Sequence, residues 1–398
     1  MVSSTQVPVL RMLPTGPAAV GQLDEAYQRL HATGPEIDGW LSNHGPMGAE
    51  AIVRRGHAAE LGPWLDGYIT RLEEFPRGLG PIGNGWRDAL GDPRRIADWT
   101  GYFRAGLSGQ PWREVVGTWW PRLLPGVVAA ATHGVIRTGH AVRALLADGE
   151  DEPHLTELAH GLAYWAARWQ TLPTGHQGAA AAAAQGRTRA QSRGPAAADR
   201  TGLTDLSGKL AAVPRMAAVP RLAGQSGGIR DRLARLPELD GWPDALAGLR
   251  APGTPEETRA TLAALVDAAA LSYLRYGHGN PVMLVHAATA PNAVLRVLPV
   301  LDSALWAPSL TAAWAASSAL TAIYAPAGAA PRAPRAPGDG EPPGPAGADR
   351  AASTFARAVE HGDAHVVKFA DTALDVFGRT GNPDALAAAH QAADLIGR

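Results

Sequence analysis

The sequence predicts an all-α protein, and three observations lead to that fold class. Ala, Leu, Trp and Arg dominate the chain, and Leu-x-x-Ala spacing, which places apolar side chains on one face of a helix, recurs along most of it. Period-2 runs of β-branched residues, which are typical of half-buried strands, are scarce. Hydrophobic residues make up 46% of the 398 positions, an ordinary fraction for a globular protein, so disorder of the whole chain is excluded.

The helical pattern is found, in chain order, near residues 21–33, 46–61, 64–74, 92–107, 113–147, 154–171, 255–276, 281–298, 308–324, 350–377 and 383–396. Pro46 and Pro281 stand where the first turn of a helix tolerates proline, so each is expected to open a helix. Pro121 and Pro125 fall inside the long segment 113–147. We expect them to break or kink it, because proline lacks the amide hydrogen that a helix interior requires.

Two low-complexity segments separate groups of helices and are expected to be flexible surface loops. Residues 174–202 are rich in Ala, Gly, Arg and Ser, and residues 325–349 are rich in Pro and Gly. We nevertheless predict a single domain over residues 1–398, because the candidate site residues come from both sides of each loop. Residues 303–331 carry no charge, but Ala and Ser supply little transfer free energy, so a buried helix is expected there rather than a membrane span.

Charge and cysteine content exclude several classes of function. The net charge is −1, which offers no electrostatic attraction to nucleic acid or to an anionic membrane. The absence of cysteine excludes disulfides, thiolate nucleophiles, iron–sulfur clusters and cysteine-bound zinc. The first residues lack a basic segment followed by a long apolar one, so no signal peptide is expected and the predicted location is the cytoplasm.

Nucleotide-binding motifs are missing or poorly matched. Residues 78–83 fit the pattern GxGxxG, but no apolar strand precedes them, and Pro81 stands where the helix of a dinucleotide site should begin. The sequence contains no GKS or GKT P-loop and no HExxH. A flavin or nicotinamide enzyme of the usual kind is therefore unsupported.

The thirteen histidines divide by their surroundings. Charged or loop-like surroundings predict a surface position for five of them, His31, His57, His154, His176 and His390. Apolar segments or loop-to-helix junctions hold another four, His44, His133, His286 and His365. Taken singly, a hydrogen-bonded core histidine is the commoner explanation for such a residue. Several together favour a metal, because one ion satisfies them all at once.

Lys368 adds to this group, since it is three residues from His365 and therefore shares its helix face. His361 is a further turn back and is an alternative to His365 as a ligand. The chain has only two lysines, Lys209 and Lys368, among many arginines. A lysine on an apolar face can extend to solvent, pair with an acid such as Asp371, or be carboxylated by CO2 to give an anionic oxygen ligand.

Five blocks of sequence carry a resemblance to a known family. In chain order they are Asn43-His44, His133-Gly-Val-Ile-Arg137-Thr-Gly-His140, Glu157-Leu-Ala with Leu162-Ala-Tyr164-Trp165, Leu284-Val-His286-Ala-x-Thr289 and Asp363-x-His365-Val-Val-Lys368. In this order, over about residues 40–370, they resemble the questin oxidase-like family. Fungal members of that family carry His where Arg137 stands and Tyr where His140 stands, a departure that concerns the substrate.

The resemblance implies a non-haem iron oxygenase whose Fe(II) is held by five residues, His44, His133, His286, His365 and a carboxylated Lys368. Five ligands leave one position of an octahedral site for O2 or for a substrate oxygen, and imidazole with oxygen ligands suits iron. The implied reaction is the O2-dependent cleavage of a C–C bond in a ring of an aromatic polyketide such as an anthraquinone. His140 or Tyr164 would move a proton, and Arg137 completes the candidate catalytic residues.

An aromatic substrate needs an apolar slot, for which the tryptophan-rich helices offer Trp119, Trp120, Trp165 and Trp169, although tryptophan at helical spacing is more often core. Two rival functions stay open. One is an NADPH-dependent Baeyer–Villiger-type oxidase, and the other is a helical binding protein without catalysis, whose histidines are core residues. The need for NADPH, the carboxylation of Lys368 and the formation of a homodimer are likewise left open by the sequence.

Overall fold

The computed structural model describes residues 16–38, 41–173, 205–224, 227–331 and 345–397, and the account below concerns these residues. They confirm the all-α class, since the one sheet among them is the antiparallel pair β1 (Glu36–Ile37) and β2 (Leu41–Ser42). The α-helices are α1 (Pro17–His31), α2 (Gly45–Arg54), α3 (Ala58–Ile69), α4 (Trp86–Ala89), α5 (Ile96–Gly109), α6 (Trp112–Leu123), α7 (His133–Ala147), α8 (Glu152–Ala167), α10 (Leu206–Ala212), α11 (Ile229–Ala234), α12 (Trp242–Ala247), α13 (Pro255–Tyr276), α14 (Pro281–Leu284), α15 (His286–Val297), α16 (Trp306–Tyr324), α17 (Pro345–His361), α18 (Ala364–Thr380) and α19 (Asp384–Leu395). Short 3-10 turns connect several of them, namely η1 (Pro93–Arg95), η2 (Leu124–Gly126), η3 (Ala129–Thr132), η6 (Met216–Ala218), η7 (Leu236–Glu238), η8 (Gly277–Gly279), η9 (Leu298–Val300) and η10 (Ser303–Leu305).

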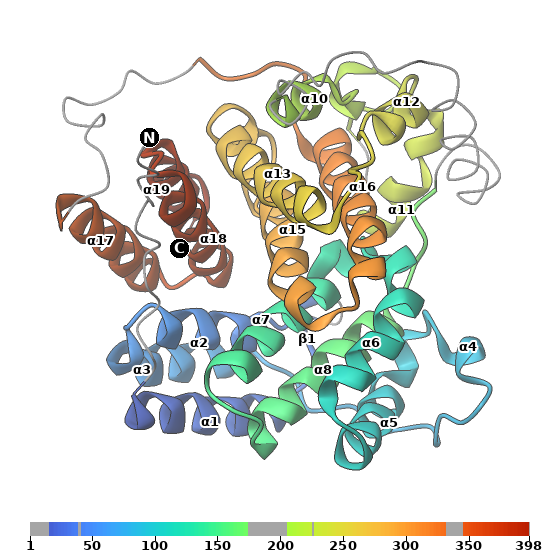
Figure 1. Ribbon diagram of the computed structural model, residues 1–398, viewed down its shortest axis with the longest axis vertical. Helices are drawn as coiled ribbons and strands as arrows, with labels where there is room; N and C mark the ends of the chain where they lie inside the picture. Colours follow the sequence, from blue (N-terminus) through green and yellow to red (C-terminus); the bar gives the residue numbers. More distant parts are fainter. Residues whose placement is uncertain (1–15, 39–40, 174–204, 225–226, 332–344, 398) are drawn as a thin grey trace, which may run out of the picture.

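The helices form three groups that meet around α7 and α15 (Figure 1). Helices α1 to α8 make the lower part of the view, α13, α15 and α16 stand above them, and α17 to α19 form a third group at one side. Helix α7 packs against α8 on one side and against α15 on the other, while α18 contacts both α2 and α15. The centre of the molecule is therefore the place where α2, α7, α15 and α18 come together.

Two glycines of α7 allow its neighbours to approach closely. A Cβ atom placed on Gly139 would lie 2.6 Å from the Cβ of Ala293 on α15, and one placed on Gly134 would lie 2.5 Å from the Cβ of Trp165 on α8. Both distances are too short for any side chain, so glycine is needed at these two contacts. The close approach of α7 and α15 also brings the first residues of the two helices near each other.

The predicted helix boundaries are confirmed where proline or capping signals marked them. Pro46 and Pro281 stand in the first turns of α2 and α14, and α13 covers residues 255–276 as predicted. The long segment 113–147 is interrupted, but Pro121 is accommodated within α6 and the interruption begins after Leu123.

The structure differs from the boundaries predicted from the sequence in three places. The segments 46–61 and 350–377 were each expected to be one helix, yet both are divided at glycines with left-handed backbones, Gly56 (φ 84°) and Gly362 (φ 86°). Glycine adopts this conformation without steric cost, so it ends the helix there. Residues 345–349 were expected in a loop but belong to α17. The predicted loop 174–202 lies outside the described residues.

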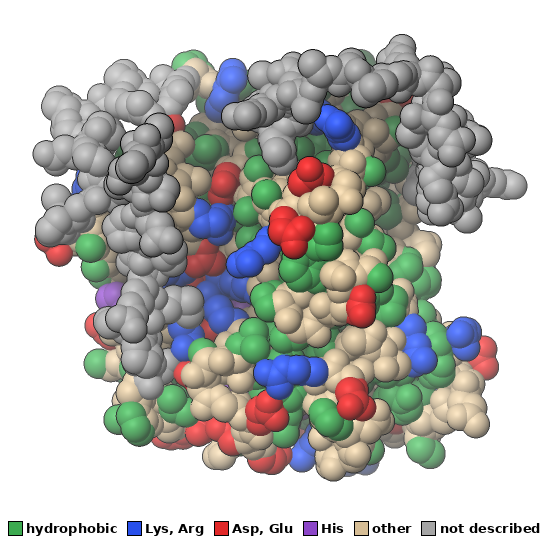
Figure 2. Space-filling model, viewed as in Figure 1, with side chains coloured by type: hydrophobic (Ala, Val, Ile, Leu, Met, Phe, Trp, Pro, Cys, Tyr) green, Lys and Arg blue, Asp and Glu red, His purple; other side chains and the backbone are tan. Residues whose placement is uncertain are grey.

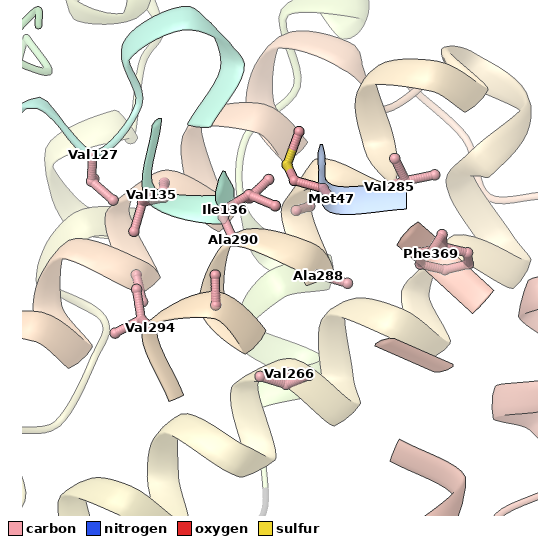
Figure 3. Close-up of a cluster of buried hydrophobic side chains, with 14 of the residues drawn as sticks. Met47, Val127, Val135, Ile136, Val266, Val285, Ala288, Ala290, Val294 and Phe369 are labelled. Carbon is pink, nitrogen blue, oxygen red and sulfur yellow. The ribbon is translucent and has the colours of Figure 1, made fainter. Parts of the chain in front are cut away.

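Buried apolar side chains from many of the helices form one core cluster, part of which is drawn in Figure 3. Residues 303–331 contain α16, whose Leu310, Trp314 and Leu320 are buried, as expected for an interior helix. Among the described residues, the stretch Pro281–Val300 is long and apolar enough to cross a membrane by length and composition, and 72% of its apolar window is buried inside the protein. A core helix has these same properties.

Candidate metal centre

Four histidines from four different helices converge at the centre of the molecule. His44 directly precedes α2, His133 and His286 are the first residues of α7 and α15, and His365 is the second residue of α18. One ring nitrogen of each lies within 4.8 Å of the corresponding atoms of the other three. Three of the four residues are buried, and His365 is partly exposed. A group of this kind could hold a metal ion.

In His44, His133 and His286 the nitrogen atoms that face one another are the Nε2 atoms. The Nε2 atom of His133 lies 2.6 Å from that of His44 and 2.9 Å from that of His286. The opposite nitrogens are directed to acceptors: Nδ1 of His133 faces the carbonyl oxygen of Ala130, and Nδ1 of His286 is 3.3 Å from the carbonyl oxygen of Met283. Nδ1 of His365 is 3.1 Å from Oδ1 of Asp363.

These outer contacts determine which nitrogen carries the hydrogen. A neutral imidazole has one N–H, and a carbonyl or carboxylate oxygen beside Nδ1 places that hydrogen on Nδ1. In His133 and His286 the lone pairs of Nε2 then face each other, which is repulsive unless a cation lies between them. Outer-sphere acceptors on Nδ1 are also the usual partners of metal-binding histidines. This arrangement of lone pairs and outer acceptors is one that could hold a metal ion.

The backbone before His133 holds an unusual conformation. Ala130, Ala131 and Thr132 all have positive φ angles, of 45°, 55° and 69°. An L-residue in the left-handed region costs about 1–2 kcal/mol, so three in succession are maintained only by the surrounding packing. The turn directs the carbonyl oxygen of Ala130 at Nδ1 of His133 and so orients the ring toward the centre.

Burial keeps the histidines neutral. Desolvation is the main cause that lowers the pKa values of His44, His133 and His286 well below the ordinary range, and the nearby Lys368 ammonium lowers them further. The pKa of His365 is lowered by burial too, although its contact with Asp363 opposes the shift. Neutral imidazoles have the free lone pair that a metal requires.

Lys368 is fully buried, one turn along α18 from His365. Its Nζ atom has no hydrogen-bond partner among the described residues. Burial lowers the pKa of this amine to about 7, with Asp363 acting in the opposite direction. The amine does not reach solvent, because the side chain is 0% exposed. It does not pair with Asp371, because that carboxylate is bound by Arg55, Arg143 and Arg296. The structure therefore contradicts an extension of the amine to solvent and a hydrogen-bonded pair with Asp371.

Beyond the histidines, the same four helices are also linked by apolar residues and by charged residues. One turn after each histidine stands a buried apolar residue, Met47, Ile136, Ala290 or Phe369, which are labelled in the core cluster of Figure 3. Helical spacing of three or four residues places them on the same face as the histidines. The convergence of the histidines is therefore supported by apolar packing from every helix that carries one.

Farther along, charged residues from each of the four helices form a buried ion network. Arg143 of α7 donates through Nε to Glu50 of α2 over 2.8 Å and through its guanidinium to Asp371 of α18 over 3.1 Å. Arg296 of α15 donates to Asp371 over 2.6 Å. Burial would raise the pKa of Asp371, but Arg143 and Arg296 hold it well below its usual range. Figure 2 shows basic and acidic side chains gathered between the α17–α19 group and α15.

The predicted catalytic residues lie outside the four-histidine group. His140 is buried with Nδ1 2.8 Å from Glu50, and Arg137 forms two hydrogen bonds of 2.6 and 2.7 Å with Glu157. The Tyr164 hydroxyl is 2.6 Å from Oγ of Ser42 and 3.0 Å from Glu36. Their roles in catalysis stay predictions. The alternative ligand, His361, is not in the group, since its Nε2 is directed to the carbonyl oxygen of Ile396.

Sequence reasoning missed a second set of buried histidines. His154 was expected at the surface but is 0% exposed, because Asp151 caps α8 and binds its ring. His160 stacks on His31 at 4.6 Å between ring centroids, and His31 contacts Glu157. His176 lies outside the described residues. The Asp-x-x-His spacing of residues 151–154 was the available signal for a helix cap.

The structure also bears on two other expectations, which concern the GxGxxG segment and the tryptophans proposed for an apolar slot. The residues that fit GxGxxG form a loop in which the amides of Leu79 and Gly80 donate to Asp98, so this segment is a turn held by a carboxylate. The tryptophans proposed for a slot include Trp120 and Trp165, which are buried against each other at 5.2 Å and belong to the core.

Buried neutral histidines predict how stability responds to acid. Burial lowers the pKa of His140 and of His160, so the unfolded chain binds more protons than the folded one below about pH 6.5. The free energy of unfolding of metal-free protein should fall as the pH is lowered from about 7 to 5. Urea denaturation at several pH values measures this slope. His160→Gln should reduce it by up to about 1.4 kcal/mol per pH unit, and a flat profile in the unmodified protein would contradict the prediction.

The fold and the site together define an all-α protein with a buried four-histidine group that could hold a metal ion. No protein-family model, no curated protein and no solved structure matches this chain.

Proposed function

We propose that this protein is a non-haem iron oxygenase that uses O2 to cleave a ring C–C bond of a planar aromatic polyketide, with Fe(II) held by His44, His133, His286, His365 and the carboxylated side chain of Lys368. The single observation that carries the proposal is the buried amine of Lys368, which has no partner beside four converging imidazoles. A buried polar group without a partner is costly, so the structure needs a reason to keep it there.

Charge balance supports carboxylation of Lys368. A divalent ion bound by four neutral imidazoles would leave two positive charges in an apolar interior. Asp363 acts electrostatically on the Lys368 amine, but its carboxylate is occupied by the ring and the backbone amide of His365. A neutral amine reacts with CO2 to form an N–C bond and gives a carbamate anion and a released proton, and the lowered pKa of Lys368 supplies that neutral form near neutral pH. The carbamate would offset one positive charge and add an oxygen ligand.

Four nitrogens and one oxygen favour iron. Zinc in proteins prefers four ligands in a tetrahedron, whereas five protein ligands suit an octahedral ion with one free position. Iron(II) bound there would supply the one-electron chemistry that O2 needs to react with a closed-shell aromatic ring. The resemblance to the questin oxidase-like family points to the same ion and supplies the substrate class in the proposal.

The protein's own residues have definable tasks in such a reaction. The acceptors on Nδ1 hold the histidine rings in orientation, and burial of His44, His133 and His286 limits the access of water to three of the four rings. Arg137 is one helical turn beyond His133, where its charge is balanced by Glu157. Tyr164 is hydrogen-bonded to Ser42, two residues before His44, and this contact links the proposed proton donor to the segment that carries that ligand.

Elemental analysis of protein purified without a histidine tag and without oxygen tests the proposal. We expect about one iron per chain, and consumption of O2 with 1,8-dihydroxyanthraquinone, with the label from 18O2 appearing in a ring-opened product. Zinc in place of iron, or turnover by metal-free protein, would overturn it. Turnover that depends on NADPH in protein without metal would favour the Baeyer–Villiger-type reaction instead.

A further inference from the structure

A cavity of about 670 Å³ lies between α3 and α17. Its lining includes His57, Trp64, Tyr68, Arg71, Val359 and Glu360. The volume is in the range of pockets that bind small organic ligands. The cavity lies outside the four-histidine group, and none of its lining residues belongs to that group.

One wall of the cavity is the back of the metal centre. The Tyr68 hydroxyl accepts a hydrogen bond of 2.7 Å from the backbone amide of His44. Nε1 of Trp64 donates to the carbonyl oxygen of Gly362 over 2.9 Å, and the next residue, Asp363, binds His365. His365 is also the one histidine of the four that is partly exposed. The aromatic wall is therefore bonded directly to the segments that present two of the four histidines.

The chemistry of the lining indicates what it would bind. The rings of Trp64 and Tyr68 are stacked, with centroids 5.1 Å apart and an angle of 13° between their planes. Such a wall suits a flat aromatic molecule. His57 lies 3.6 Å from Glu60, whereas Arg71 has no ion-pair partner among the residues that the structure describes. The guanidinium of Arg71 could therefore bind a carboxylate or phenolate group on the same aromatic ligand.

We propose that this cavity binds a planar aromatic acid, with the rings along Trp64 and Tyr68 and the acidic group at Arg71. Binding there does not rest on the proposed function, because none of the residues that form the cavity is one of the four histidines or Lys368.

A second cavity provides an internal control. It also measures about 670 Å³ and has aromatic lining, but it lies between α5 and α6, and Tyr102, Trp119 and Arg122 line it. Arg122 in this second cavity already stacks on Trp119, with its guanidinium carbon 4.8 Å from the ring centroid. None of its lining residues belongs to the helices that carry the four histidines. A ligand that recognised aromatic surface alone would occupy either cavity.

Glycines in the two linings give matched blocking variants. Gly67 lines the α3–α17 cavity and Gly101 lines the α5–α6 cavity, both within helices. A Cβ atom added at either position meets no heavy atom within 4 Å, so Gly67→Trp and Gly101→Trp can be accommodated without a clash at the backbone. Replacing glycine in a helix interior also removes its entropic disadvantage, which favours folding.

Isothermal titration with anthraquinone-2-carboxylate tests the proposal, in the wild-type chain and in metal-free His286→Ala protein. We expect one binding site in both, weakened at least about tenfold by Gly67→Trp and less than about twofold by Gly101→Trp. Arg71→Gln should weaken this probe but leave the neutral 2-(hydroxymethyl)anthraquinone unchanged. Absence of binding, or weakening by Gly101→Trp alone, would overturn the proposal.

The two proposals can fail separately. Suppose that Gly67→Trp loses binding while the wild-type protein contains no iron. This result would support ligand binding in the α3–α17 cavity and would reject the proposed function as an iron oxygenase. If iron is present and Gly67→Trp binds the probe normally, the cavity is not the binding site, although the metal centre stands. Thermal unfolding of each variant confirms that the protein used in the titration is folded.

Discussion

Replacing Lys368 with Met should lower the affinity for iron at least about 100-fold and abolish turnover, since removing even an outer-sphere partner of a metal ligand commonly costs 10- to 100-fold. Methionine has nearly the same length and no charge, so it can occupy the buried position, but it cannot form a carbamate. In metal-free protein the same change should raise the free energy of unfolding by about 1–3 kcal/mol, because it removes a buried amine that has no partner. Iron content and urea denaturation measure the two effects.

Lys209→Met is the matched control, because Lys209 on α10 is the one other lysine of the chain. Protein equilibrated with 13C-labelled bicarbonate should show a carbamate carbon resonance that persists in Lys209→Met and disappears in Lys368→Met. A Lys368→Met protein with the iron content and turnover of the wild type would show that the amine is an ordinary core group and that carboxylation plays no part.

Replacing His286 with Ala should reduce iron from about one per chain to nearly none. His286 is fully buried, its Nε2 is 2.9 Å from that of His133, and no other described side chain donor replaces it in the group. The alanine leaves a polar hollow open to water where the ligand stood, and a site that lacks one ligand holds its ion weakly. The chelator concentration that removes half of the iron gives the loss of affinity.

His160→Ala provides the comparison for this variant, because His160 is also a buried histidine but lies outside the four-histidine group. It should lose stability through its cavity and its ring contact with His31, yet keep its iron. Equal iron content in the His286→Ala and wild-type proteins would mean that the metal is bound elsewhere. A variant of His361 should also keep the metal, since its Nε2 is directed to a backbone carbonyl oxygen.

Much of the candidate centre was predictable because its signals are local. The spacing of His365 and Lys368 places them on one helix face, and Pro46 and Pro281 mark helix starts close to His44 and His286. Apolar neighbours predicted that these histidines would be buried. His154 failed the same test, since its charged neighbours suggested the surface, whereas its aspartate partner satisfies the ring and allows full burial.

The sequence by itself determined the helical class, since periodicity is a property of neighbouring residues, and it determined which residues can offer a metal lone pairs. Only the tertiary structure decided that four helix starts meet, because the contacts that hold them together join residues far apart in the chain. Arg143 and Asp371 are separated by 228 positions, and no local pattern indicates that they pair. The cavity beside Trp64 and Tyr68 arises likewise from α3 meeting α17, and distant packing of this kind also converts Lys368 from an ordinary lysine into a buried amine with no partner.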